Sequence, residues 1–305
     1  MLCPRKCAVN RSIKKGICGC TDKIIAGAAV VHRGEEPPLT GQLGSGTVFF
    51  SGCHLKCSYC QNMQISHGCM GQELNETSLA DCFLMLQEKG CANINLVTPT
   101  HFSPQIIESL DIAKSRGLYL PIVINSGGYE SIETLEMWKD HAAIWLMDIK
   151  YGDNATGKLL SNVKDYWDVS RQAVSWIFER FGPLVTDASD LAASGLIIRH
   201  LVLPGMLSNP FSVLEFIAAL STGIPVSIMS QYSPAFYTGE LPEMKRTLLQ
   251  EEYDTVIERA VEMGFETIYA QDIVSHEVYM PDFAKPCPFN DCKNILMEKT
   301  EVSQR

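Results

Sequence analysis

Short apolar runs alternate with amphipathic segments along most of the 305-residue chain. The runs are rich in β-branched residues and of strand length, which predicts buried strands. Their predicted bounds are Thr47–Ser51, Ile94–Thr98, Leu120–Asn125, Ile144–Ile149, Leu196–Leu203, Val226–Ser230 and Thr267–Ala270. Strands that alternate with helices are typical of βα units around a parallel sheet.

Two of the intervening helices carry clear end signals. The helix predicted at Pro104–Arg116 follows Ser103, a good capping residue, and precedes Gly117. A second helix is predicted at Leu248–Met263. Six or seven βα units between residues 45 and 275 favour a barrel or partial barrel over a doubly wound sheet, although periodicity alone leaves both open. Barrel chemistry gathers at the C-terminal ends of the strands.

Composition divides the chain into three predicted parts. Residues 1–44 form a cysteine-rich arm and a Gly- and Pro-rich linker, 45–275 the partial barrel, and 276–305 a C-terminal tail. Residues 1–23 hold six Lys and Arg against one acidic residue, a charge of +5. The whole chain has a net charge of −10, so the remainder carries −15.

The overall composition, 46% hydrophobic and 20% charged, is that of a soluble globular protein. No apolar run approaches the ~18 residues of a membrane helix, and Met1–Cys7 lacks the apolar stretch of a secretory signal. We therefore expect a cytoplasmic protein without a membrane partner. Because an acidic surface repels phosphates, nucleic acid is a disfavoured partner.

Twelve cysteines are too few for a disulfide scaffold of this length, and in a reducing compartment they favour metal binding or catalysis. Cys69, Cys82 and Cys91 stand apart, and the latter two are expected to be buried core thiols. The others form three groups: Cys3, Cys7, Cys18 and Cys20; Cys53, Cys57 and Cys60; and Cys287 and Cys292.

The middle group, Cys53-x3-Cys57-x2-Cys60, directly follows the strand predicted at Thr47–Ser51. Three thiolates within eight residues can converge on one centre, and all-thiolate ligation favours iron–sulfur or zinc. Three ligands on a loop at a barrel strand end indicate a cluster with one open iron. The alternative is a structural zinc site completed by Cys69 or by a distant cysteine.

This triad, with Tyr59 just before its last cysteine, resembles the signature of radical S-adenosylmethionine (SAM) enzymes. More narrowly, the chain looks like the pyruvate formate-lyase activating enzyme branch, among its uncharacterised homologues. The segments that carry the resemblance run through almost the whole chain: Leu2–Cys7, Ser45–Cys53, Tyr59–Asn62, Asn93–His101, Asn125–Glu130, Asp148–Lys150 and Ile198–Gly205.

The resemblance implies an α/β fold with an open (β/α)6-type TIM barrel, and a [4Fe–4S] cluster held by Cys53, Cys57 and Cys60. SAM would bind the fourth iron, and cluster reduction would release a 5′-deoxyadenosyl radical that abstracts hydrogen from a substrate. The preferred substrate is a glycine of a partner glycyl-radical enzyme. A small molecule or RNA substrate is the sibling hypothesis. A non-catalytic iron–sulfur or zinc protein, carrying electrons or scaffolding a partner, is the alternative of a different class.

The resemblance also implies SAM contacts at strand ends. Tyr59 would meet the adenine, or simply pack within its loop. Asp148 and Lys150 would lie near the methionine carboxylate, or form a solvated strand end. Asn125 and Ser126 would contact ribose or methionine, or form a plain strand-to-helix turn.

Further candidates occupy three other strand ends. Arg199 and His200 alternate along one strand, so one faces the barrel interior. The resemblance favours Arg199 as the cofactor or substrate contact. Gln231 and Tyr232 are candidate substrate contacts. Where the family has Gly-Gly-Glu beside the methionine ammonium, this chain has Thr98-Pro99-Thr100, followed by His101, without the acid. Backbone carbonyls, the two hydroxyls or the His101 ring are candidate replacements, and helix packing is the alternative for His101.

The N-terminal group Cys3, Cys7, Cys18 and Cys20 is a candidate second site for zinc or an iron–sulfur centre. A flexible arm with free thiols is the alternative. Cys287 and Cys292 are candidates to join that site, although nothing local requires it. The arm's positive charge suits docking of an acidic electron donor, flavodoxin or ferredoxin-like.

Overall fold

The computed structural model describes residues 2–275, 280–289, 292 and 294–296. The strands are β1 Ile24–His32, β2 Ser45–Phe50, β3 Gln72–Leu74, β4 Ile94–Val97, β5 Ile122–Ser126, β6 Ile144–Asp148, β7 Val185–Thr186, β8 Ala192–Leu201, β9 Val226–Met229 and β10 Ile268–Ala270. The helices are α1 Pro37–Thr40, α2 Met63–Ser66, α3 Glu76–Glu88, α4 Ser103–Ser115, α5 Ile132–Trp138, α6 Asn154–Ser161, α7 Tyr166–Phe181, α8 Pro210–Leu220 and α9 Gln250–Glu262. Short 3-10 helices are η1 Thr100–Phe102, η2 Pro204–Met206, η3 Pro234–Phe236 and η4 Pro242–Lys245.

One sheet, in the order β10-β9-β8-β6-β5-β4-β2-β1-β3, organises the molecule. The strands from β2 to β10 along this path are parallel, while β1 and β3 extend the β2 edge in antiparallel fashion. Within the described residues, the two end strands β10 and β3 do not pair with each other. The sheet is therefore open, and the expectation of a partial barrel is confirmed.

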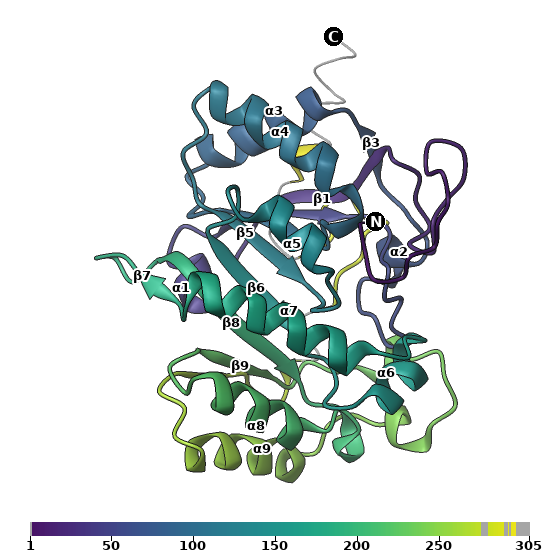
Figure 1. Ribbon diagram of the computed structural model, residues 1–305, viewed down its shortest axis with the longest axis vertical. Helices are drawn as coiled ribbons and strands as arrows, with labels where there is room; N and C mark the ends of the chain where they lie inside the picture. Colours follow the sequence, from purple (N-terminus) through teal and green to yellow (C-terminus); the bar gives the residue numbers. More distant parts are fainter. Residues whose placement is uncertain (1, 276–279, 290–291, 293, 297–305) are drawn as a thin grey trace.

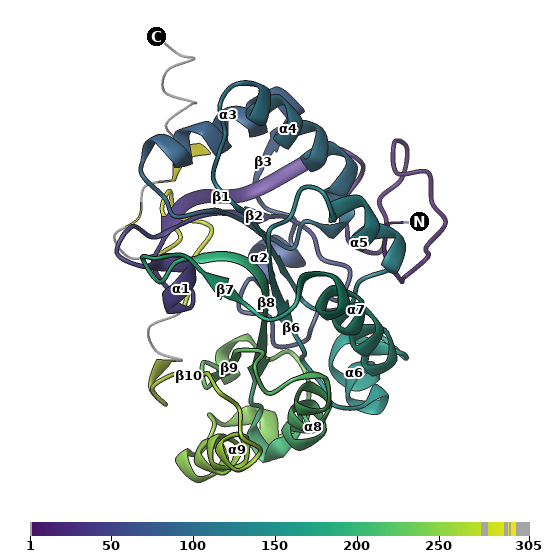
Figure 2. The ribbon, with the colours of Figure 1, turned by 60° about the vertical axis from the view of Figure 1, so that its left-hand side comes forward.

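Helices α3, α4, α5, α7, α8 and α9 follow one another along the outer face of the curved sheet (Figures 1 and 2). Alternate strand residues such as Ile94, Leu96, Ile124 and Ile198 are apolar and fully or almost fully buried against these helices. This period of two explains why the outer face is uniformly hydrophobic.

The lower interior of the barrel is filled by a separate small core. Leu39, from α1, packs against Val123, Ile144, Leu146 and Ile197 of the parallel strands, and all five are fully buried. The helix α1 follows the end of β1, which pairs with the beginning of β2. This plug closes the barrel end opposite to the cysteine loop and leaves the upper interior for a site.

All seven predicted strands are present, with their ends shifted by up to four residues. The sequence analysis assigns Ile24–His32 to the arm and linker, whereas the structure pairs this segment with β2 as β1. Its run of small alanines gave no strong strand signal, and the pairing depends on the neighbouring strand. Of the predicted tail 276–305, the described residues return to β1, where Asn294 accepts a hydrogen bond from the Ala29 amide.

No helix in the described part of the chain has the length and apolarity that a membrane crossing requires.

Candidate functional site

The cysteine triad lies on the loop that leaves the carboxyl end of β2. Gly52 begins the loop with φ +81°, a conformation that favours glycine. A Cβ here would lie 2.4 Å from Cys20 Sγ and 2.9 Å from the Cys18 carbonyl oxygen. The Cys53 amide also donates to that carbonyl at 3.2 Å. The N-terminal arm is therefore packed directly against the start of the loop.

Arg5 fixes the loop from the other side. Its guanidinium donates to the carbonyl oxygens of His54 at 2.7 Å and Leu55 at 3.2 Å. It also donates to Ser161 at 2.9 Å and Asn162 at 2.5 Å, at the C-terminal end of α6. A cation at this end complements the helix dipole. The Arg5 side chain thus links the arm to the cysteine loop and to α6. The arm is therefore packed against the protein at this point, unlike the flexible arm of the alternative hypothesis.

Cys53, Cys57 and Cys60 line one end of a single interior cavity of about 230 Å³. The Ser161 hydroxyl donates to Cys57 Sγ at 3.0 Å, and the Ser66 hydroxyl donates to Cys60 Sγ at 3.3 Å. Burial, with the neighbouring Cys57, raises the pKa of Cys53 to about 12 and also raises that of Cys60. Thiols held this way need a metal to ionise at neutral pH.

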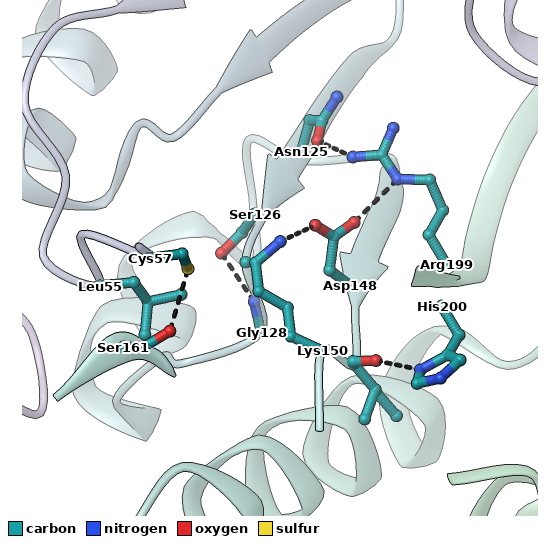
Figure 3. Close-up of polar contacts among 12 residues, drawn as sticks. Leu55, Cys57, Asn125, Ser126, Gly128, Asp148, Lys150, Ser161, Arg199 and His200 are labelled. Carbon is teal, nitrogen blue, oxygen red and sulfur yellow. Dashed lines mark hydrogen bonds and ion pairs between the residues drawn. The ribbon is translucent and has the colours of Figure 1, made fainter. Parts of the chain in front are cut away.

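A ladder of alternating charges runs from the cysteines into the barrel (Figure 3). Lys150 Nζ lies 2.5 Å from Asp148 Oδ2, and Arg199 Nε lies 2.8 Å from Asp148 Oδ1. Arg199 also contacts Glu35 at 3.1 Å and donates to the Asn125 side-chain oxygen at 2.6 Å. The structure therefore brings together Asn125, Asp148, Lys150 and Arg199, four predicted residues from the ends of three strands.

Pairing, rather than burial, decides the charge state of this ladder. Burial opposes the charge on Asp148, yet Arg199 and Lys150 hold the pKa of its carboxyl below the usual value. Burial likewise opposes the charges on Lys150 and Arg199, while Asp148 raises the pKa of both. All three are ionised near neutral pH, and they offer both signs of charge to a zwitterionic ligand.

Ser126 lines the same cavity, and its hydroxyl donates to Glu130, a fully buried acid that the sequence analysis did not single out. The Thr100 hydroxyl donates to the same Glu130 oxygen at 2.7 Å, and His54 Nε2 lies 3.9 Å from it. Burial raises the pKa of Glu130. The structure thus places the acid Glu130 behind Ser126. The segment Asn125–Glu130 carries part of the family resemblance, but the sequence analysis gave Glu130 no role.

Of the Thr98-Pro99-Thr100 segment, one residue reaches the cavity. Thr98 lines the cavity with φ +58°, a strained conformation for threonine. Pro99 and Thr100 are not among the cavity-lining residues that the described chain provides. His101 faces away, and its Nε2 lies 2.7 Å from the Ser51 carbonyl oxygen. Of the two roles left open for His101, the geometry therefore favours packing.

The remaining candidates lie around the rim and on the outer face. Tyr59 lines the cavity and packs edge-on against Tyr151 and Tyr232 at ring distances of 6.4 and 6.0 Å. Gln231 and Tyr232 both line the cavity. His200 points to the opposite side of β8 from Arg199, where Nδ1 lies 2.6 Å from the Ile149 carbonyl oxygen (Figure 3).

The other cysteines form smaller groups. Cys3, Cys7 and Cys18 line one cavity beside the arm. Cys20 has a side-chain hydrogen bond with Cys18, and its Sγ lies 3.8 Å from Cys69 Sγ. Cys287 and Cys292 are joined to each other by a disulfide, so they do not join the N-terminal group. Cys82 and Cys91 are buried in the main core. Across the described residues, no three Cys, His, Asp or Glu side chains surround a single-ion position.

Glu35 and Glu36, just before α1, are functional candidates that the sequence analysis missed. Both line the cavity floor. They belong to a Gly- and Pro-rich stretch that reads as a linker, and only its insertion under the barrel brings them to the site. The sequence signal that could have identified them is the pair of adjacent acids followed by two prolines.

Comparisons with known proteins agree with this geometry. The family model described as "Radical SAM superfamily" matches residues 47–191. An uncharacterized protein of Methanocaldococcus jannaschii is 30% identical over 277 residues, covering 88% of this chain and 75% of that protein. The pyruvate formate-lyase-activating enzyme of Clostridium pasteurianum is 29% identical over 173 residues, 52% of this chain and 71% of that enzyme.

Proposed function

Because this chain belongs to the radical SAM superfamily, we propose that it is an activating-enzyme-like oxidoreductase that takes a hydrogen atom from a glycine of a partner glycyl-radical enzyme. The observation that carries the proposal is that three loop cysteines line the same cavity as the Lys150–Asp148–Arg199 ladder. The named relative from Clostridium pasteurianum supports the choice of partner.

The donor set suits a [4Fe–4S] cluster at Cys53, Cys57 and Cys60. All three are thiols of one loop, two of them accept hydroxyl hydrogen bonds, and they face a cavity with room for a further ligand. A cluster held by these three cysteines would supply, once reduced, the electron for cleavage of the sulfonium of SAM. The chain's own residues bind, orient and shield the reactants.

The cavity-lining residues suit the parts of SAM. We propose that Asp148 and Lys150 hold the ammonium and carboxylate of its methionine end, because they present both charges side by side. Asn125, Ser126 and Thr98 offer polar groups at neighbouring strand ends. Tyr59 offers an apolar ring for the adenine. Pro99 and Thr100 then support the site without touching SAM, Pro99 through its backbone and Thr100 through its hydrogen bond to Glu130.

We propose that Cys3, Cys7 and Cys18 hold a second metal centre, because they line one cavity. Metal analysis of the C3A and C7A proteins tests this proposal. If the variants keep the cluster iron but bind less metal than the wild type, the arm holds a second site. The exposed Lys14 and Lys15 of the arm remain candidates to dock an acidic electron donor.

The deciding experiment measures 5′-deoxyadenosine after anaerobic reconstitution, reduction and addition of SAM. We expect product from the wild type and from C91A, whose thiol lies in the main core, and none from C53A, C57A or C60A. A product-free wild type with an intact reduced cluster would favour the electron-carrier or scaffold hypothesis.

The glycine assignment needs a separate readout. Incubation with a candidate glycyl-radical enzyme should yield a glycyl radical, seen by electron paramagnetic resonance. If 5′-deoxyadenosine forms and no partner yields that signal, a small-molecule or RNA substrate becomes the better hypothesis.

A further inference from the structure

The charge ladder ends on an acid that has no cation of its own. Lys150 and Arg199 match Asp148 and Glu35, two charges of each sign linked by contacts of 2.5 to 3.1 Å. Glu36, the next residue, forms no ion pair with any described residue, although it is only 7% exposed. Its Oε2 atom is buried without a hydrogen-bond partner. A buried carboxylate in this condition is costly unless something else supplies the donor.

The groups next to Glu36, namely Asn95 and Glu35, also have no free hydrogen-bond donor to offer to a ligand. Asn95, fully buried, donates its Nδ2 to Glu35 at 2.9 Å, which fixes the amide orientation. Its Oδ1 is then left without a partner. Glu35 already accepts three hydrogen bonds, from Asn95, Asn125 and Arg199. Two unsatisfied side-chain atoms lie in this region, Glu36 Oε2 on a cavity-lining residue and Asn95 Oδ1 on the amide beside Glu35, and both are acceptors.

Glu36 follows Glu35 at the Arg199 end of the charge ladder, while Lys150 is at the other end. Lys150, at the upper end, is close enough for Cys57 to raise its pKa, whereas the charges that act on Glu36 are those of Arg199 and Glu35. The plug formed by Leu39 lies below, so Glu36 faces the interior from beneath. A molecule that reaches from the cysteines into the barrel would end at this residue.

Fixed conformation favours a binding role. Glu36 is the residue before α1, where Pro37 and Pro38 set the backbone, and its carbonyl accepts from the amides of Leu39 and Thr40 at 2.8 and 3.2 Å. The backbone that carries the carboxyl is therefore fixed before any ligand arrives, and the Ser227 side chain hydrogen-bonds to the carboxyl itself. Burial raises the pKa of Glu36, which a bound cation would reverse.

We propose that Glu36 is the substrate-recognition group of this site and binds a cationic nitrogen group, ammonium or guanidinium, of the molecule that loses hydrogen. This inference rests on the proposed function and names the chemistry of its substrate. The cation belongs either to a Lys or Arg side chain near the target glycine or to a small amine.

The test compares matched probes by isothermal titration calorimetry on the reconstituted holoprotein. One pair is n-butylammonium against 1-butanol, and the other is acetyl-Gly-Lys-amide against acetyl-Gly-norleucine-amide. In at least one pair we expect the cationic member to bind about tenfold more tightly, a difference of ~1.4 kcal/mol. A preference confined to the peptide pair assigns a protein side chain, and one confined to the amine pair assigns a small molecule. Equal binding within both pairs overturns the proposal.

Variants locate the preference. E36Q should abolish it and E36D should retain part of it, whereas E215Q, an exposed acid of α8, should leave it unchanged. A preference that survives in folded E36Q places the cation elsewhere and overturns the proposal. If E36Q does not fold, the wild-type pairs and E36D still decide. If the protein forms 5′-deoxyadenosine but does not prefer the cationic probes, this inference is wrong and the proposed function stands. If it prefers the cationic probes but forms no 5′-deoxyadenosine, the proposed function is wrong.

Discussion

At the scale of single residues, the cysteine loop is tuned by its neighbours. Ser161 donates to Cys57 Sγ at 3.0 Å and in turn contacts the Tyr151 hydroxyl at 2.7 Å. Hydrogen bonds to the sulfurs of an iron–sulfur cluster stabilise its reduced, more negative state. Ser161 lies about a hundred residues from the triad, and no spacing in the sequence links the two.

We expect S161A to lower the reduction potential of the reconstituted cluster. A neutral hydrogen bond contributes ~1 kcal/mol, which for one electron corresponds to about 40 mV. S58A is the matched control, because the Ser58 hydroxyl is in the same loop and has no hydrogen-bond partner among the described residues. A redox titration followed by electron paramagnetic resonance measures both, and equal potentials would show that Ser161 has no such role.

At the scale of elements, the arm and the β2 loop form one packed unit. Gly52 permits this, because a side chain there would meet Cys20 and the Cys18 backbone. The arm also supplies Arg5, which bonds four carbonyl groups of the cysteine loop and the α6 terminus. The cysteine loop therefore depends on a segment that composition alone describes as a basic arm.

G52A should destabilise the protein far more than G90A. Both glycines have similar positive φ values, +81° and +79°, so each alanine incurs ~1 kcal/mol of backbone strain. Only at Gly52 does the added Cβ meet atoms within 3 Å, while nothing lies within 4 Å at Gly90. We expect an additional loss of ~2 kcal/mol at Gly52, measured by anaerobic denaturant unfolding. Equal losses would mean that the arm does not pack there.

At the scale of the whole molecule, buried neutral histidines link stability to pH. Burial lowers the pKa of His200 to about 4. Of its nearest charges, Asp148 raises that pKa and Lys150 lowers it. The unfolded ring takes up a proton from about pH 6.5, whereas the folded ring does so only near pH 4. The free energy of unfolding therefore falls as the pH decreases from about 6.5 to about 4.

H200N should remove this contribution, because asparagine can still donate to the Ile149 carbonyl but does not titrate. Between pH 7.5 and 5.5 the wild type should lose ~1.4 kcal/mol more than H200N. Unfolding curves at both pH values measure the difference, with H141N, on the partly exposed His141, as control. Parallel losses in wild type and H200N would contradict the burial argument.

Local sequence signals predicted the βα repeat and the cysteine triad, because apolar strand-length runs and ligand spacing within one loop are read from short windows. The open barrel came from the family resemblance, since periodicity left a doubly wound sheet as an alternative. The family resemblance also predicted Asn125, Asp148, Lys150 and Arg199 as site residues. The structure brings them together because strand ends in parallel sheets converge at one edge.

Three features became visible only in the folded chain: β1 joins the sheet, Arg5 and Ser161 support the cysteine loop, and Glu35 and Glu36 line the cavity. Each depends on contacts between segments far apart along the chain. Such contacts are set by how the elements pack, and a short window of sequence carries no record of them.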